Sequence, residues 1–277
     1  MIVIKRIGYI GAQSKHLVYF GEILASGVPG LDSSSGYVWA PDAPKLVSSR
    51  LAAGELAGSC DTLDELMEKS DAIMILTRDG RTHRKYAEIC IENKKPVFVD
   101  KPFACDEQDA AAIIEASEKH QVPIMGGSTL CWLPETESVR QSVKDAYEIT
   151  IQFTADWDSP YGGWYYYGSH LTDLCAAIGG CDAIGFEAKR DGRKVSANVF
   201  YNNLTVNLVS APEIKKLSFF IKYKNGESQQ ILVPRYERCY RFGMERFSDM
   251  LKTGKSVHPE RLLFSTVLLD SIIKRLS

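Results

Sequence analysis

The chain has 277 residues, of which 45% are hydrophobic and 25% are charged, and its formal net charge is −2 at pH 7. This balance is typical of a globular protein with a sizeable core, and the length suits two domains. The near-neutral charge argues against a nucleic-acid-binding surface, and no cationic amphipathic segment indicates binding to a membrane.

The first residues lack the features of a signal peptide, and no window approaches the roughly 20 apolar residues of a membrane helix. The seven cysteines are scattered and contain no C-x-x-C pair. Reduced thiols in a cytoplasmic protein are therefore expected. His16, His120 and His258 stand apart from cysteines and carboxylates in the sequence, so no metal site is predicted.

The first 125 residues alternate short apolar runs with helical segments. Strands are expected over 2–10, 37–39, 72–76, 96–99 and 122–125. Helices are expected from about 12 to 24 and over 62–69, 83–93 and 106–119, with Asp61 or Thr62 as the N-cap of the second. This order predicts a doubly wound parallel sheet of the Rossmann type.

After residue 126 most strands follow one another without helices between them. They are expected over 148–156, 184–190, 195–201, 204–209, 217–223 and 230–233, with hairpin turns at Asn202-Asn203 and Asn225-Gly226. Helices are expected over 170–178, 237–252 and 259–276. The pattern predicts a mainly antiparallel sheet with one open face.

The sequence therefore predicts an α/β protein with two domains that share a cleft. A dinucleotide-binding Rossmann domain covers 1–125. An α+β domain for substrate binding and oligomerisation covers 126–277, and its last helix is a candidate to pack back on the first domain. The open face predicts a homodimer or homotetramer, because an exposed apolar sheet face needs a cover.

The first chemical motif lies where the first strand leads into a helix. Gly11 matches the first glycine of a G-x-G-x-x-G fingerprint, but Gln13 and His16 occupy the second and third positions. A glycine and a helix N-terminus at this place suit a pyrophosphate. An ordinary strand-to-helix turn explains the segment equally well.

Asp42 follows the second strand, close to where a carboxylate that binds the ribose is expected. It is a candidate to bind the 2′-hydroxyl, which would favour NAD, or a plain turn residue. The choice between NAD and NADP stays open.

Lys101 comes just after the strand at 96–99, at the sheet edge where ligands bind in open α/β folds. A lysine there can donate to a substrate oxygen as negative charge develops on it, and a nearby cation would lower its pKa. The alternative is a surface lysine in a loop.

His170 and Asp173 lie three residues apart at the start of a helix, after a run of aromatic residues and glycines. A histidine in an apolar pocket is suited to remove a hydroxyl proton while a hydride leaves the carbon. The alternative is a helix that packs its aromatic side into the core.

Taken in order, these motifs resemble the glucose–fructose oxidoreductase/inositol dehydrogenase (Gfo/Idh/MocA) family. Asp100-Lys101-Pro102 resembles its E-K-P signature with aspartate in place of glutamate, and segment 168–173 resembles its G-x-H-x-x-D signature. Segment 71–77 with His83 resembles the family's strand, T-P loop and histidine beside the nicotinamide.

The resemblance implies an NAD- or NADP-dependent dehydrogenase or reductase that acts on a hydroxyl or carbonyl carbon of a sugar, sugar acid or cyclitol. Lys101 is the implied catalytic lysine and His170 the implied acid/base. The predicted catalytic residues are Lys101, His170, Asp173 and Tyr166, and the predicted cofactor-binding residues are Gly11, Ala12, Gln13, Asp42, Thr77, Arg78, His83, Asp100 and Lys101.

Two departures from the family pattern bear on this reading. Tyr166 occupies a position where the family commonly has aspartate, so either Tyr166 or Asp173 substitutes or the proton relay is simpler. Arg78 replaces the proline of the T-P loop, which indicates a short subgroup with D-K-P. Two alternatives remain, an NAD-assisted lyase that oxidises a sugar transiently and a non-catalytic binding or regulatory homologue.

Overall fold

The structure is a computed structural model that describes residues 4–277, so the part of the first predicted strand at residues 2–3 lies outside it. The chain forms two compact units. Unit 1 holds the described residues up to Ala104, together with Gln108–Gly126 and Tyr240–Pro259. Unit 2 holds Cys105–Glu107, Gly127–Cys239 and Glu260–Ser277.

Unit 1 is built on a six-stranded parallel sheet in the order β3-β2-β1-β4-β5-β6. The strands are β1 (Ile7–Ile10), β2 (Tyr37–Trp39), β3 (Gly58–Ser59), β4 (Ala72–Ile75), β5 (Val97–Val99) and β6 (Ile124–Gly126). The chain order reverses between β1 and β4, as in a doubly wound fold, which confirms the predicted Rossmann sheet.

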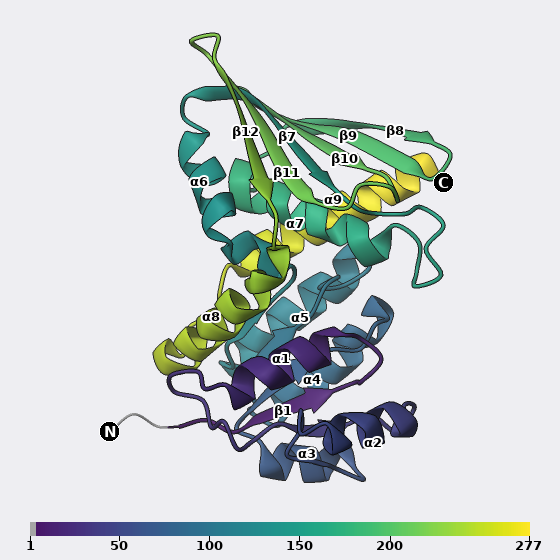
Figure 1. The fold of residues 1–277 in the computed structure, drawn as a ribbon, viewed down its shortest axis with the longest axis vertical. Helices are drawn as coiled ribbons and strands as arrows, with labels where there is room; N and C mark the ends of the chain where they lie inside the picture. The colour runs from purple at the N-terminus through teal and green to yellow at the C-terminus, as the bar shows by residue number, and fades with distance from the viewer. Residues whose placement is uncertain (1–3) are drawn as a thin grey trace. The chain divides into compact units, whose positions relative to one another are not determined.

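The helices of this part are α1 (His16–Ala25), α2 (Pro44–Ala52), α3 (Leu63–Lys69), α4 (His83–Glu92) and α5 (Glu107–His120), with the 3-10 turn η1 (Gly80–Thr82). Helix α4 packs on β4 and β5, and α3 packs on β1 and β2; Figure 1 labels both helices, with α1, in the Rossmann part of the chain. Thr62 is the N-cap of α3, and its side chain accepts from the Glu65 backbone N–H. Helix α2 and strand β3 were not predicted.

Gly11 is required by the close approach of two strand ends. Its φ is +92°, and a Cβ on it would lie 2.8 Å from the backbone nitrogen of Thr77. Any side chain would collide with the loop after β4 and adopt an unfavourable backbone conformation. The glycine therefore keeps the β1 and β4 ends in contact.

Helix α8 (Cys239–Thr253) completes unit 1, although it follows unit 2 in the chain. Tyr240 stacks on Tyr19 of α1 with ring centroids 4.6 Å apart, and the Ser248 hydroxyl donates to the Pro29 carbonyl. Beyond α8, the Val257 N–H donates to the Ile124 carbonyl at the edge of β6. The last helix, α9 (Pro259–Leu276), begins at the unit boundary and its residues from Glu260 onward belong to unit 2.

Unit 2 contains a second six-stranded sheet in the order β12-β11-β7-β10-β9-β8. The strands are β7 (Ala146–Phe153), β8 (Gly185–Asp191), β9 (Lys194–Tyr201), β10 (Leu204–Ser210), β11 (Leu217–Tyr223) and β12 (Ser228–Val233). Strands β7 and β10 pair in parallel and all other neighbours pair antiparallel, which confirms a mainly antiparallel sheet.

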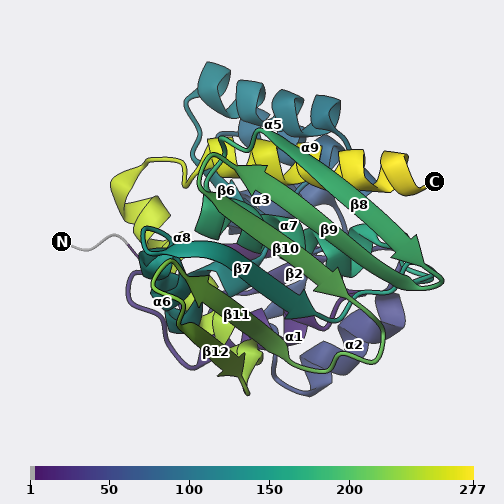
Figure 2. The same ribbon diagram turned by 90° about the horizontal axis from the view of Figure 1, so that it is seen from above.

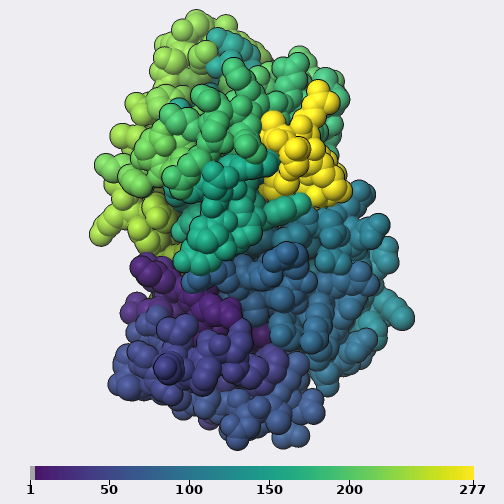
Figure 3. All heavy atoms as spheres, turned by 90° about the vertical axis from the view of Figure 1, so that its right-hand side faces the viewer, coloured from purple at the N-terminus to yellow at the C-terminus, as the bar shows by residue number. Residues whose placement is uncertain are grey.

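Helix α7 (Tyr165–Gly179) packs on β7 and β10, and Figure 2 shows it running behind the sheet. The unit also contains η2 (Thr129–Trp132), α6 (Pro134–Ser142) and η3 (Tyr236–Arg238). Figure 3 shows the end of α9, in yellow, at the surface of unit 2. Helix α6 was not predicted, and α7 begins five residues before the predicted start.

The other face of this sheet is polar with a few apolar side chains. The register aligns Glu148 with Lys222 and Thr150 with Asn207, and Glu148 and Lys222 form an ion pair at 2.7 Å. Phe220, next to Thr150, is half-buried on this face. None of the helices within residues 4–277 combines the length and apolar character needed to cross a bilayer.

Candidate dinucleotide and proton-transfer sites

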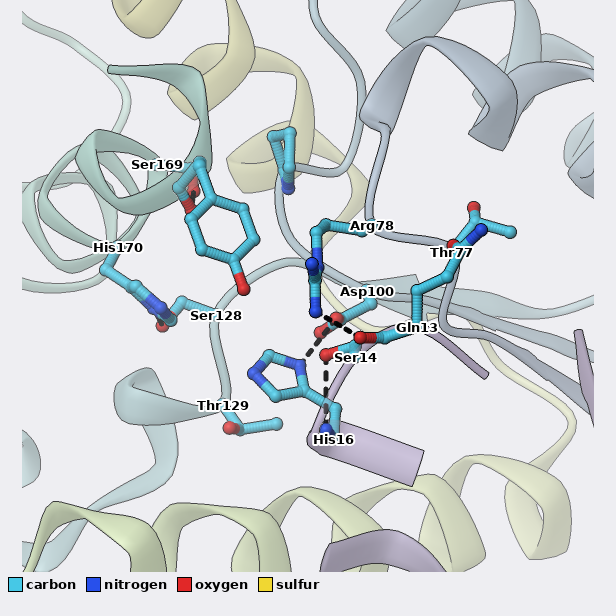
Figure 4. A network of polar contacts seen from close by, with 12 residues as sticks. Gln13, Ser14, His16, Thr77, Arg78, Asp100, Ser128, Thr129, Ser169 and His170 are labelled. Atoms are coloured by element: carbon cyan, nitrogen blue, oxygen red, sulfur yellow. Dashed lines mark hydrogen bonds and ion pairs between the residues drawn. The ribbon is translucent and has the colours of Figure 1, made fainter. Parts of the chain in front are cut away.

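The carboxyl edge of the unit 1 sheet brings several predicted residues together. The Gln13 side-chain amide donates to the Asp42 carboxylate. The Arg78 guanidinium donates to the Gln13 backbone carbonyl (Figure 4). Ala12 is buried between these contacts and Gly11. The loop after β1 is thus tied to the loops after β2 and β4.

This edge suits an anionic ligand. Lys15, at the N-cap of α1, provides no side-chain cap, and the first turn of the helix holds no acidic residue. The positive end of the helix dipole is therefore not neutralised by its own first turn. A dinucleotide pyrophosphate fits this arrangement, although only the first fingerprint glycine is present.

Lys101 lies just past β5 and is only 2% exposed. Burial lowers the pKa of its ammonium to about 8, and the positive charge of Arg78 acts in the same direction. The negative charge of Asp100 opposes both effects. A lysine with a pKa near the working pH can exchange a proton with a substrate oxygen.

His16 is a residue that sequence analysis missed. It is the first residue of α1, and its Nδ1 lies 2.6 Å from Oδ2 of Asp100 (Figure 4). Both side chains are buried, with exposures of 7% and 4%. Their separation by 84 positions in the chain explains why the sequence pattern gave no signal. His16 stands apart from carboxylates in the sequence, but the fold brings it into contact with Asp100.

His83 is hydrogen-bonded to two loops of this edge. Its side chain is fully buried, with Nδ1 2.8 Å from the Pro102 carbonyl and Nε2 2.9 Å from the Thr77 carbonyl. The Thr77 hydroxyl in turn bonds that of Thr82 at 2.8 Å. His83 therefore joins the loop after β4 to the loop after β5, and both ring nitrogens are engaged by the protein backbone.

In unit 2, His170 lies on α7 in a mixed polar and aromatic setting. Its Nδ1 is 2.6 Å from the hydroxyl of Ser128, a partner that sequence analysis did not identify. The rings of Phe153 and Tyr167 each lie 5.4 Å from the imidazole ring. If Nδ1–H donates to Ser128, Nε2 carries the lone pair and can accept a proton.

Asp173 anchors the segment that carries Ser128. Its Oδ2 accepts from the Ser128 backbone N–H at 2.7 Å, and its Oδ1 accepts from the Ser265 hydroxyl of α9 at 2.7 Å. Gly127 packs directly against it, because a Cβ there would lie 2.8 Å from Oδ2. Asp173 is 2% exposed, so its carboxylate connects α7, α9 and the segment after β6.

Tyr166, on the same helix, belongs to a row of aromatic rings that starts before the helix at Tyr161. Its ring centroid lies 5.1 Å from that of Tyr161 and 4.8 Å from that of Tyr167. Since Tyr167 packs on His170, the row leads from the exposed Tyr161 to the histidine. Among residues 4–277, no three His, Cys, Asp or Glu side chains are arranged to hold a metal ion.

Comparison with known proteins gives one family match. Residues 38–128 match the model of GFO_IDH_MocA, described as an oxidoreductase family with an NAD-binding Rossmann fold. No match was found among curated proteins.

Solved structures share the fold over nearly the whole chain. A myo-inositol 2-dehydrogenase from Lactobacillus plantarum superimposes with a TM-score of 0.81 at 11% identity, over 98% of this chain and 96% of its own. An oxidoreductase from Agrobacterium radiobacter in complex with NAD+, L-tartaric acid and magnesium gives 0.76 at 16%, over 96% and 94%. A 3-ketoreductase from Actinomadura kijaniata, crystallised with NADP and TDP-benzene, gives 0.77 at 13%, over 98% and 97%.

These findings show that the Rossmann part of the chain is similar to the Gfo/Idh/MocA family. The family model accounts for β2 to β6 of the Rossmann sheet, and the solved structures match its fold together with that of unit 2. The predicted nicotinamide dinucleotide cofactor agrees with the NAD-binding description of the matched family. An oxidoreductase is the activity that the match supports.

Proposed function

We propose that the protein is an NAD- or NADP-dependent oxidoreductase of the Gfo/Idh/MocA type. It acts on a hydroxyl or carbonyl carbon of a sugar, sugar acid or cyclitol. The observation that carries this proposal is Lys101, a buried lysine with a lowered pKa at the carboxyl edge of a Rossmann sheet. Such a lysine is costly to bury, and a proton-transfer role accounts for its position.

The dinucleotide would be held by residues of the loops after β1, β2 and β4. Gly11, Ala12 and Gln13 would border the pyrophosphate, and Thr77 and Arg78 would line the cofactor on the neighbouring loop. The Asp42 carboxylate would accept from the ribose 2′-hydroxyl and repel a 2′-phosphate, so we propose a preference for NAD. When bound, the nicotinamide supplies the hydride acceptor or donor.

The chain's own residues manage the proton. Lys101 donates a hydrogen bond to the substrate oxygen and stabilises the negative charge that develops on it. His170 takes up the hydroxyl proton, with its ring orientation fixed by Ser128 and, through the Ser128 segment, by Asp173. Asp173 and Tyr166 are then supporting groups, since Asp173 is held by two hydrogen bonds and Tyr166 packs within the aromatic row.

The sugar-like substrate class is supported by the structural relatives, two of which are a myo-inositol dehydrogenase and a 3-ketoreductase. The row from Tyr161 to Tyr167 offers aromatic faces of the kind that pack against the C–H face of a sugar ring. We also propose a cytoplasmic location, because all seven cysteines are free thiols. The D-K-P motif defines the proposed subgroup.

The deciding experiment is calorimetric titration of the purified protein with NAD, NADH, NADP and NADPH, followed by a screen of sugars, sugar acids and cyclitols. We expect micromolar binding of NAD and NADH, weaker binding of the phosphorylated pair, and absorbance change at 340 nm with one substrate class. Lys101→Ala should retain cofactor binding and lose turnover by a factor of about 100 or more.

Other outcomes would change the assignment. Turnover of a glycoside without net change in NADH absorbance would indicate the lyase alternative. Absence of binding by every dinucleotide, with no cofactor carried through purification, would rule out the oxidoreductase and leave a binding or regulatory role.

A further inference from the structure

His16 stands at the third glycine position of the dinucleotide fingerprint, where a side chain is normally avoided. Its ring is nevertheless buried, with the Tyr240 ring 4.9 Å away on one side and Asp100 on the other. The His16 backbone N–H donates to the Ser14 hydroxyl, which fixes the first turn of α1. The side chain thus connects the fingerprint loop with the end of β5.

Asp100 is the link between His16 and Lys101. Its backbone N–H donates to the Ile75 carbonyl, so the residue is still part of the sheet. Its carboxylate accepts from the His16 ring and from the Lys101 backbone N–H, and these contacts and the nearby positive charges outweigh burial and lower its pKa. Asp100 is therefore a fixed negative charge that touches the lysine's own backbone.

A second histidine, His83, is hydrogen-bonded to the loop after β5 on the far side of Lys101 from Asp100 in the sequence. His83, the first residue of α4, bonds the Pro102 carbonyl at 2.8 Å. Asp100 and Pro102 are thus each fixed by a buried imidazole from the start of a helix, with Lys101 between them. Within unit 1, the charged and titratable groups around this loop are Asp100, Arg78, His16, His83 and, against the His16 ring, Tyr240.

We propose that His16 is a positioning residue for Lys101: by holding the Asp100 carboxylate in a hydrogen bond, it sets how much negative charge the lysine ammonium experiences and thus the pH at which Lys101 changes charge. The inference rests on the proposed role of Lys101 in proton transfer. It adds a residue outside the signatures of the matched family, at a position where a glycine would contribute no side chain.

The effect on Lys101 has a definite sign. Removing the His16 donor leaves the Asp100 carboxylate with less compensation, so the ammonium is stabilised and its pKa rises. Replacing Asp100 with asparagine removes the negative charge, so the pKa of Lys101 falls. If His16 only fills space between α1 and the sheet, these two changes have no reason to act in opposite directions.

The test follows the ¹³Cε resonance of Lys101 with pH in protein labelled with ¹³C-lysine, with the resonance assigned by its loss in Lys101→Arg. We expect the midpoint to rise by about half a unit in His16→Leu and to fall by about one unit in Asp100→Asn. His16→Asn keeps a donor near the position of Nδ1 and should stay close to the wild type. Leucine fills the buried volume, and thermal melts confirm that each variant folds.

The proposal is overturned if the titration midpoint of Lys101 is unchanged in His16→Leu. It is also overturned if His16→Leu and Asp100→Asn shift that midpoint in the same direction. If His16→Leu does not fold, the comparison of His16→Asn with His16→Gln decides, because glutamine places its donor elsewhere and should raise the midpoint. The resonance is measured without substrate, so the result stands even if the protein turns over no sugar. Conversely, dehydrogenase activity with an unmoved midpoint rejects the role of His16 alone.

Discussion

At the scale of the residue, the candidate sites depend on residues whose burial or backbone conformation is unfavourable for folding. Lys101 is buried with its charge opposed by desolvation and by Arg78, and Gly11 accepts a backbone conformation that other residues avoid. Both features lower stability or restrict the sequence. They are retained at the sheet edge where the proposed cofactor and substrate react, and each predicts a measurable trade-off.

Lys101→Met should stabilise the protein at neutral pH. The folded-state pKa of about 8 lies below the ordinary value of 10.5, so the unfolded chain holds the proton more tightly. Wild-type stability therefore rises as pH increases from about 8 to about 10.5, and the burial cost is present in full only below that window. Denaturant unfolding at pH 7 should show a gain on the order of 2 kcal/mol.

The gain from Lys101→Met should shrink as the pH approaches 10.5. Lys45→Met, at an exposed lysine of α2, is the matched control and should change stability little at either pH. A loss of stability in Lys101→Met at pH 7 would mean that the ammonium is well compensated.

Gly11→Ala should destabilise unit 1 and abolish dinucleotide binding. The new Cβ would lie 2.8–2.9 Å from backbone atoms of Thr77, in addition to the cost of φ +92°. Gly27→Ala separates the two effects, because Gly27 has a φ of +90° and no atom within 4 Å of the added Cβ. We expect a loss of about 1 kcal/mol in Gly27→Ala and clearly more in Gly11→Ala. Equal losses would show that the Thr77 contact is unimportant.

At the scale of the element, the Asp173 carboxylate links three segments of unit 2 by hydrogen bonds. One carboxylate receives a backbone N–H from the segment after β6 and a hydroxyl from α9, while α7 carries it. Three segments far apart in the chain therefore share one buried acceptor. Such an arrangement loses stability when any one partner is removed.

Ser265→Ala should cost about 1 kcal/mol, because Asp173 keeps its other hydrogen bond. Asp173→Ala should cost about 3 kcal/mol or more, since it leaves two buried donors without their acceptor. The double variant should cost less than the sum, which urea unfolding can measure. Strict additivity would show that Ser265 and Asp173 do not act together.

The sequence pattern predicted most elements because strands and helices in this chain have contrasting periodicity. Strand β4, with every side chain buried, and the hairpin at Asn202-Asn203 are examples. The two missed helices, α2 and α6, both begin with a proline at the first helical position. Proline also marks turns, so the sequence alone did not reveal that each one starts a helix.

Residues of the candidate sites could be predicted from the sequence only where they belong to a recognisable motif. Lys101 and His170 follow from the order of signatures, and their surroundings now include Asp100, Ser128 and Ser265. His16 pairs with a residue 84 positions away, and no periodicity connects them. Contacts of this kind arise from the crossing of chain segments in space, which a single sequence does not encode as a local pattern.

At the scale of the whole molecule, the outer face of the second sheet is the proposed contact between subunits. It is polar over most of its area, with Phe200 on β9 and Phe220 on β11 half-buried on it. Glu148 and Lys222 form an ion pair on it. A second copy of the same face can cover these apolar groups.

We expect light scattering to give the mass of a dimer or tetramer. Phe220→Lys together with Phe200→Lys should shift it to the monomer, because two unpaired charges would enter the interface. Leu46→Lys, at an exposed leucine of α2, is the matched control and should leave the mass unchanged. A monomeric wild type would remove the sheet face as an interface.

The late position of α8 in the chain has a consequence for biosynthesis. Strands β1 to β6 leave the ribosome within the first 126 residues, yet Tyr240 and Val257 supply contacts to α1 and to β6. These surfaces of the nascent Rossmann sheet therefore stay uncovered while residues 127–239 of unit 2 are translated. Truncation after residue 126 would produce a domain that lacks its final helix, because unit 1 also needs residues 240–259.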